Sequence, residues 1–203
     1  MRLHHALFAL ALIAVPSAAH ADEPAPFGAR APNVLSVDNL LGATYSVAGD
    51  SNDDYEIAAV GSHPLMLELF VSPQTRLGYH RFLNDTVSLG TGLTWYAAGG
   101  SIGFTLLGVS PRIGVTFPLS SGLSLWVRAG GGYAHWSYQG DASENDWSLG
   151  AEAYLVGTPV SHFGWTFGPM VDVTVSGKYK TERSESKVHR NVYGLTFGFF
   201  FDL

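Results

Sequence analysis

The last thirteen residues alternate between two kinds of side chain. Every odd position from Tyr193 to the terminus is apolar, whereas the even positions are mostly small or polar. Successive side chains of a strand point to opposite faces, so this pattern predicts a strand with one wholly apolar face. Its length suits a bilayer, whose hydrocarbon is crossed by about 9 to 11 tilted strand residues. The apolar face consists of Tyr193, Leu195, Phe197, Phe199, Phe201 and Leu203.

The same alternation recurs upstream, with turn signals between the segments. Tight connections at Asn84-Asp85, at 120–122 and at 160–162 alternate along the chain with longer or more polar ones. Such alternation is typical of membrane barrels, whose short turns face the periplasm and whose longer loops face outward. The sequence therefore predicts an all-β, eight-stranded, antiparallel up-and-down transmembrane β-barrel. The predicted strands are 34–47, 67–83, 86–98, 104–119, 123–138, 146–159, 163–177 and 191–203.

The direction of the apolar faces separates a membrane barrel from a soluble, lipocalin-like one. Charged residues make up 14% of the chain, against about 25% in ordinary soluble proteins. The interior of an eight-stranded barrel is only just filled by side chains, so large residues such as Phe117, Trp147 and Trp165 would overfill it. The opposite faces are small and polar. We therefore expect the apolar faces to meet lipid, where a closed barrel satisfies its own backbone.

This arrangement resembles the small outer-membrane β-barrels of Gram-negative bacteria of the OmpA/OmpX type. The resemblance covers nearly the whole mature chain and implies a monomer with a plugged lumen and no cofactor. It also implies two partners, outer-membrane lipids including lipopolysaccharide and the outer-membrane assembly machinery. In that family the machinery reads the closing strand, so the six apolar residues from Tyr193 to Leu203 are the expected assembly signal. Leu203 replaces the usual terminal Phe.

The first residues have the three parts of a secretory signal peptide. A basic start at Arg2 precedes a short apolar run, and Ala19-His20-Ala21 provides a small-x-small cleavage site. We expect residues 1–21 to be the signal, 22–33 a periplasmic lead-in and 34–203 the barrel. Without Arg2 the chain has ten Lys and Arg against seventeen Asp and Glu, a formal charge of −7. Nucleic acid is therefore an unexpected partner.

Aromatic residues on the apolar parity cluster near both ends of the predicted strands. Aromatic side chains favour the two membrane interfaces of a barrel, so the clustering predicts two girdles. The alternative is that aromatic residues are simply common in strands. Tyr45, Trp95, Tyr133 and Trp147 belong to the outer girdle, and Tyr79, Phe117, Trp165 and Phe201 belong to the inner one.

Charged residues on the opposite, inward parity balance each other. Unpaired charges in a dry interior are costly, so three cations and three carboxylates predict a paired network that fills the lumen. Trp and Tyr side chains share that parity and add volume. An ion-selective filter or gate is the functional alternative. The predicted network consists of Glu68, Arg76, Arg112, Arg128, Glu152 and Asp172.

Signals for catalysis and metal binding are weak. The histidines of the mature chain are widely separated and lack the spacing of a metal site. The strongest enzyme signal is His135-Trp136-Ser137 with Glu144 nearby, which looks like the His-x-Ser pair of lipid A deacylases, where a base activates a hydroxyl. Tyr138 stands where that family has Asn. We expect a structural or surface-interaction role through the outer loops, with a deacylase-like enzyme and a small pore as alternatives.

Overall fold

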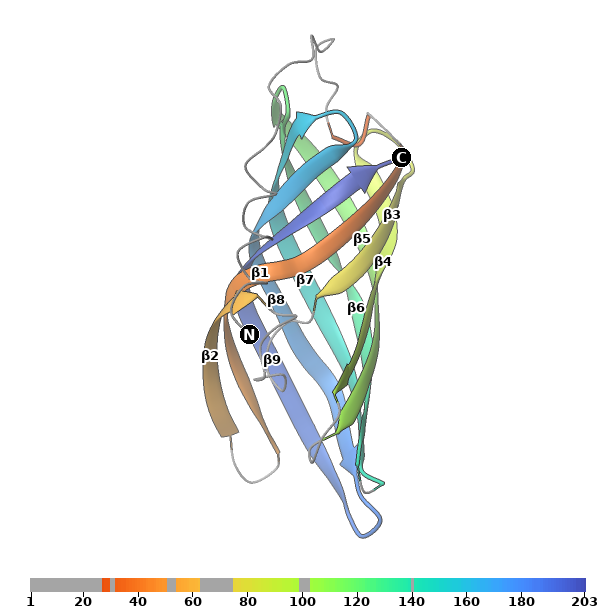
Figure 1. The fold of residues 1–203 in the computed structure, drawn as a ribbon, viewed down its shortest axis with the longest axis vertical. Coiled ribbons are helices and arrows are strands. Elements are labelled where there is room, and N and C mark those ends of the chain that lie inside the picture. The colour runs from red at the N-terminus through yellow and green to blue at the C-terminus, as the bar shows by residue number, and fades with distance from the viewer. Residues whose placement is uncertain (1–26, 30–31, 51–53, 63–74, 99–102, 140) are drawn as a thin grey trace, which may run out of the picture.

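A computed structural model of the chain describes residues 27–29, 32–50, 54–62, 75–98, 103–139 and 141–203. These residues form nine antiparallel β-strands (Figure 1). No helix long and apolar enough to cross a membrane occurs among them. The strands are β1 (Asn33–Asp50), β2 (Asp54–Ser62), β3 (Arg76–Phe82), β4 (Val87–Ala98), β5 (Phe104–Ser120), β6 (Leu123–Tyr138), β7 (Ser143–Val160), β8 (Phe163–Lys180) and β9 (Glu185–Asp202).

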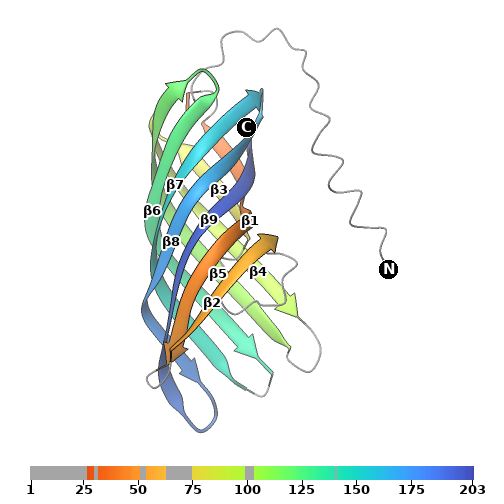
Figure 2. The ribbon, with the colours of Figure 1, turned by 90° about the vertical axis from the view of Figure 1, so that its left-hand side faces the viewer.

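Eight of the strands close into a ring. β3 to β9 pair in chain order, and β1 pairs with both β3 and β9, which closes the barrel (Figures 1 and 2). β2 forms a hairpin with the second half of β1, from Leu41↔Ser62 to Gly49↔Asp54. The prediction of an all-β, eight-stranded antiparallel barrel is therefore confirmed.

An irregularity in β1 marks the point where it exchanges one neighbour for another. Up to Asp38 the strand pairs with β3, and from Leu41 it pairs with β2. Its register against β9 shifts between Val37 and Leu41, and Asn39 in this stretch has a φ of 58°. Left-handed backbone is unusual for a residue other than glycine, and Asn is among those that tolerate it best. A β-bulge at Asn39 thus redirects β1.

The strands differ from the predicted ones mainly at one end. β7 begins at Ser143, β8 runs to Lys180 and β9 begins at Glu185, all within segments predicted as loops. Likewise, residues 54–62 form β2 where a long loop was predicted. Of the predicted strand 67–83, residues 67–74 lie outside the described residues and β3 accounts for the remainder. The hairpins opposite the tight turns are therefore longer than the apolar pattern indicated.

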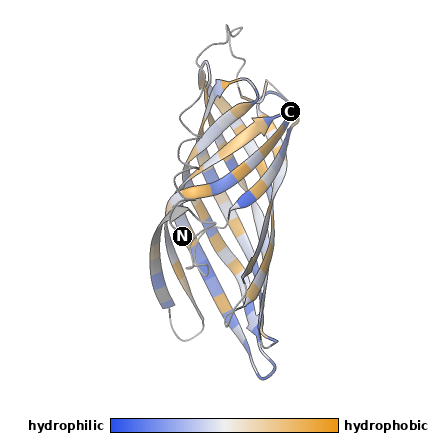
Figure 3. Ribbon diagram, viewed as in Figure 1, coloured by the Kyte–Doolittle hydropathy of each residue, from blue (hydrophilic) through white to orange (hydrophobic). Residues whose placement is uncertain are grey.

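Side chains alternate between the inside and the outside of the wall. β3 shows a strict buried and exposed alternation along its seven residues, and Figure 3 shows hydrophobic and hydrophilic positions interspersed along the strands. Bulky apolar side chains cover the outside, with Leu77 65%, Leu149 62% and Trp95 74% exposed. Trp126, Trp136 and Tyr154, by contrast, are almost fully buried inside. The outer surface is apolar and the lumen is filled.

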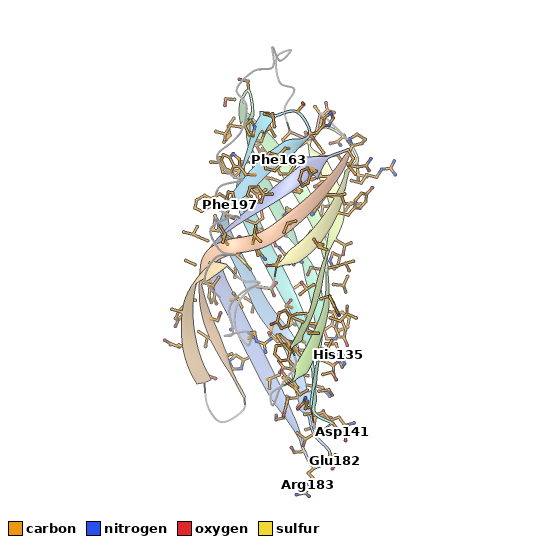
Figure 4. The ribbon with its side chains drawn as sticks, in the orientation of Figure 1. His135, Asp141, Phe163, Glu182, Arg183 and Phe197 are labelled. Atoms are coloured by element: carbon orange, nitrogen blue, oxygen red, sulfur yellow. The ribbon has the colours of Figure 1, made fainter. Side chains whose placement is uncertain are left out.

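The two ends of the barrel differ in their connections. Asn33 pairs with Arg81 and Val34 pairs with Asp202, so the start of β1, the end of β3 and the end of β9 lie together. We call this the turn end, because the short β3–β4, β5–β6 and β7–β8 connections share it (Figure 2). The opposite, hairpin end includes the β8–β9 tip with Glu182 and Arg183 (Figure 4).

Candidate functional site in the lumen

An aromatic cluster closes the lumen at the turn end. Phe27, which precedes β1, is 2% exposed. Its ring lies 5.2 Å from that of Phe82, 5.1 Å from that of Trp126 and 4.9 Å from that of Phe200. Aromatic contacts at such separations are favourable in edge-on and tilted geometry. Gly28, with a φ of 97°, lets the chain turn away from this contact. A Cβ at position 28 would lie only 2.6 Å from the carbonyl oxygen of Asp85. These four aromatic residues block the turn end of the lumen, and we call Phe27, Phe82, Trp126 and Phe200 the cork.

A network of buried ion pairs lies next to the cork, on the side of the hairpin end, and Glu152 is at its centre. The Glu152 carboxylate accepts a hydrogen bond from Arg76, lies 3.4 Å from Nε of Arg112 and lies 2.7 Å from Nη2 of Arg128. Arg128 also donates to Asp38 at 3.0 Å. Such pairs offset the cost of burial only when each charge has partners. The central network consists of Asp38, Arg76, Arg112, Arg128, Glu152 and Asp172, with as many guanidinium groups as carboxylates.

Arg128 links the network to the cork. Its guanidinium carbon lies 4.5 Å from the Trp126 ring centroid and 4.8 Å from that of Tyr154, within the range of cation–π contacts. Its Nη1 is 3.1 Å from Nε2 of His80, whose ring in turn meets Trp126. Charged and aromatic side chains thus interlock, and the turn-end half of the lumen is packed like a protein core.

A second charged cluster fills the lumen toward the hairpin end. Arg190 of β9 donates to Glu144 at 2.7 Å and to Asp146 at 3.4 Å, both on β7. Its guanidinium lies 4.9 Å from the centroid of Trp136, which packs with Phe104 and Leu106. The hydroxyl of Tyr138 also donates to Glu144, at 2.9 Å. We call Glu144, Asp146 and Arg190 the outer cluster.

A cavity of about 130 Å³ separates the two charged groups. Arg76 and Asp172 of the central network contribute to its wall on one side, and Asp146 and Arg190 of the outer cluster contribute on the other. Polar side chains of both groups line this space, so it can hold water molecules or a small polar solute.

The structure brings together most of the residues that the inward parity selected. Arg76, Arg112, Arg128, Glu152 and Asp172 lie in the central network, whereas Glu68 lies outside the described residues. Sequence reasoning missed Asp38, although period-two alternation with Ser36 places it inside. It also missed Asp146, the first residue of a predicted strand, and Arg190, the last residue of a predicted loop.

The three weak catalytic candidates do not come together. His135 and Ser137 lie on the outer side of β6, with His135 labelled in Figure 4. Glu144 is on the opposite, inward face of β7 and is held by Arg190. His135 instead contacts Asn145, whose Oδ1 lies 2.9 Å from Nδ1 of the ring. Glu144 therefore cannot complete a catalytic set with His135 in this arrangement.

The predicted girdle and assembly residues lie on the outer face. Tyr45, Tyr79, Trp95, Phe117, Trp147 and Phe201 are 41% to 74% exposed, and Tyr133 and Trp165 are partly buried. Tyr193, Leu195 and Leu203 are exposed, while Phe197 and Phe199 are half-buried against each other, with centroids 4.8 Å apart. Their roles at the interface and in assembly stay predictions. No group of three or more metal-ligating side chains occurs among the described residues.

Comparison with solved structures places the fold among outer-membrane barrels. Neisserial surface protein A superposes with a TM-score of 0.52 at 11% identity, covering 85% of this chain and 97% of that one. OprG of Pseudomonas aeruginosa gives a TM-score of 0.49 at 12% identity, covering 88% of this chain and 100% of that one. No protein-family model matches the chain, and no curated protein matches it. The first likeness shows the fold, an eight-stranded outer-membrane-type barrel.

Proposed function

We propose that the protein is a non-conducting barrel of the bacterial outer membrane that holds its hairpins at the cell surface for recognition. The observation that supports this most is the filled lumen. The cork, the central network and the outer cluster occupy it at three successive levels, while β7, β8 and β9 extend into long polar hairpins. A rigid, closed scaffold with exposed loops suits binding better than conduction.

The outer surface supports a location in the membrane. Monomeric soluble proteins rarely expose contiguous apolar patches of more than a few hundred Å². Here bulky apolar side chains stand exposed on every strand of the ring, among them Leu35, Leu77, Leu93 and Ile113. A membrane-spanning sheet requires a closed ring of strands, and the pairing of β1 with both β3 and β9 closes such a ring at the turn end.

The hairpins offer the surface for recognition. In the β8–β9 hairpin the outermost turn is ordered by Thr181, whose hydroxyl accepts from the backbone N–H of Ser184 at 3.1 Å. Exposed Lys180, Glu182 and Arg183 surround it. Both signs of charge are present at this tip, which favours a polar or charged partner outside the cell.

A bilayer recording separates this function from transport. The purified protein, its folding verified by heat-modifiable gel migration, should give no conductance steps in planar bilayers, whereas a large porin recorded in parallel provides the positive control. The cavity between the charged clusters is the one observation that favours a small pore. Regular steps from the folded wild-type protein would therefore replace the proposed function with transport.

A crosslinking experiment tests the surface role directly. A photoreactive amino acid replaces Arg183 at the hairpin tip or, as a matched control, Asp85 in the short β3–β4 turn. Irradiation of intact cells should give adducts with surface molecules from position 183 that position 85 does not give. Identical adduct patterns from both positions, or none from the tip, would contradict recognition by the hairpins.

A further inference from the structure

Four polar residues form a continuous row across the outside of β6, β7, β8 and β9. They are direct cross-strand partners, His135↔Asn145, Asn145↔Lys178 and Lys178↔Lys187. Lys178 is 61% exposed and Lys187 is exposed, whereas His135 and Asn145 are half-buried. We call these four residues the basic row. None of the four is acidic, so the row has a positive formal charge.

The basic row lies just beyond the aromatic side chains of the predicted outer girdle. Tyr133 and Trp147 pair directly, with ring centroids 4.8 Å apart, and Trp147 pairs with Ser176. His135, Asn145 and Lys178 each stand two residues farther toward the hairpin end, which is about 7 Å along a strand. Aromatic girdles sit at the headgroup level. The row therefore lies at the height where lipid phosphates are found.

The geometry of the row leaves donors available to an anion. Asn145 Oδ1 accepts from the Tyr133 hydroxyl at 2.8 Å and faces His135 Nδ1 at 2.9 Å, so the oxygen side of this amide is occupied. Its N–H₂ group forms no hydrogen bond within the described part of the chain and can donate to an anion. Lys187 forms no ion pair among the described residues. Like charges directly opposite each other in a sheet are destabilising, so the Lys178↔Lys187 pair favours a shared counter-charge.

Glu185 supplies only part of that counter-charge. Its Oε1 lies 2.8 Å from Nζ of Lys178, and both groups are exposed. The amine of Lys178 is cationic at neutral pH, as lysine side chains ordinarily are. In the strand register Glu185 lies opposite Lys180, which is farther toward the tip than Lys178. The side of the row that faces the girdle is therefore left open.

We infer that the basic row binds a phosphate of a glycolipid headgroup in the outer leaflet, of the lipid A class. Lysine is an effective phosphate ligand as a point charge, and amide N–H groups add directional donors. The inference rests on the proposed location in the outer membrane. It assigns a phosphate site and specific residues to the lipopolysaccharide partner that the resemblance implies.

The apolar surface next to the row distinguishes a lipid from a soluble anion. Trp147 and Leu149 are 58% and 62% exposed on β7, and Val175 is 64% exposed on β8. These side chains lie on the turn-end side of the row, where the acyl chains of a bound glycolipid would run. A phosphorylated lipid matches both surfaces, whereas inorganic phosphate would use only the basic row.

Binding of bisphosphorylated lipid A to the folded protein in detergent micelles tests the inference. The row variant Lys178→Gln/Lys187→Gln should bind about tenfold more weakly than wild type, which corresponds to about 1.4 kcal/mol. The matched variant Lys180→Gln/Arg183→Gln removes the same charge from the tip and should keep the wild-type affinity. Equal affinity in the row variant, or equal losses in both variants, would overturn the inference.

Two further arms identify what the row recognises. Dephosphorylated lipid A should bind the wild-type protein as weakly as intact lipid A binds the row variant; unchanged binding would show that phosphate is not recognised. Inorganic phosphate should compete poorly, and displacement at matched concentration would assign the row to soluble anions. If these arms fail, the heat-modifiable gel migration and the absence of conductance steps should still be observed. Failure of this inference is therefore distinguishable from failure of the proposed function.

Discussion

Glu152 is the shared ion-pair partner of three buried arginines in the lumen. Its carboxylate serves Arg76, Arg112 and Arg128, and it is 2% exposed. Removing one partner of a buried ion pair is far more costly than the pair is stabilising, because the remaining charge stays buried. In this lumen three guanidinium groups would lose their shared partner at once.

We therefore expect Glu152→Gln to lower the free energy of unfolding by about 3 to 5 kcal/mol. Urea unfolding in lipid vesicles, followed by heat-modifiable gel migration, measures it. Asp172→Asn is the matched control, since this carboxyl side chain is 26% exposed and contacts only Arg112 among the guanidinium groups, at 3.5 Å. The control should lose about 1 kcal/mol. Similar losses in both variants would show that the network does not depend on Glu152.

The β-bulge in β1 shows how a single backbone conformation shapes an element. Asn39 holds a φ of 58°, and its Oδ1 accepts from the Tyr154 hydroxyl at 3.2 Å. Asn39→Val should destabilise the barrel by about 1 to 3 kcal/mol, because a β-branched residue is strained in left-handed backbone. Asn39→Gly removes the same hydrogen bond without that strain and should lose about 1 kcal/mol. Urea midpoints that rank the glycine variant below the valine variant would contradict a conformational role.

The strand ends explain which elements could be predicted from the sequence. β4, β5 and β6 match their predicted ranges closely, because the apolar outer face persists along nearly their whole length. The pattern fades where β7, β8 and β9 continue past Trp147 and polar residues stand on both faces. Arg190 and Glu144 lie in these extensions, so their ion pair was not predicted, whereas Arg128 and Glu152 stand between clear apolar neighbours.

The orientation of the barrel across the membrane can be tested with introduced cysteines. It contains no cysteine, so a single introduced cysteine reports on one position. In intact cells a membrane-impermeant maleimide should label Arg183→Cys at the hairpin tip. It should label Asp85→Cys only after the outer membrane is permeabilised. The reverse labelling pattern would show that the barrel has the opposite orientation. Labelling of both sites in intact cells would argue against a membrane location.

The site in which the Phe27 ring packs, here called its seat, depends on closure of the barrel. Phe82, Trp126 and Phe200 build that seat from β3, β6 and β9. Since β9 is the last strand and closes onto β1, the seat is complete only when the final seam has formed. The contact between Phe27 and Trp126 therefore depends on closure of the ring, so the environment of Trp126 reports whether the barrel is closed.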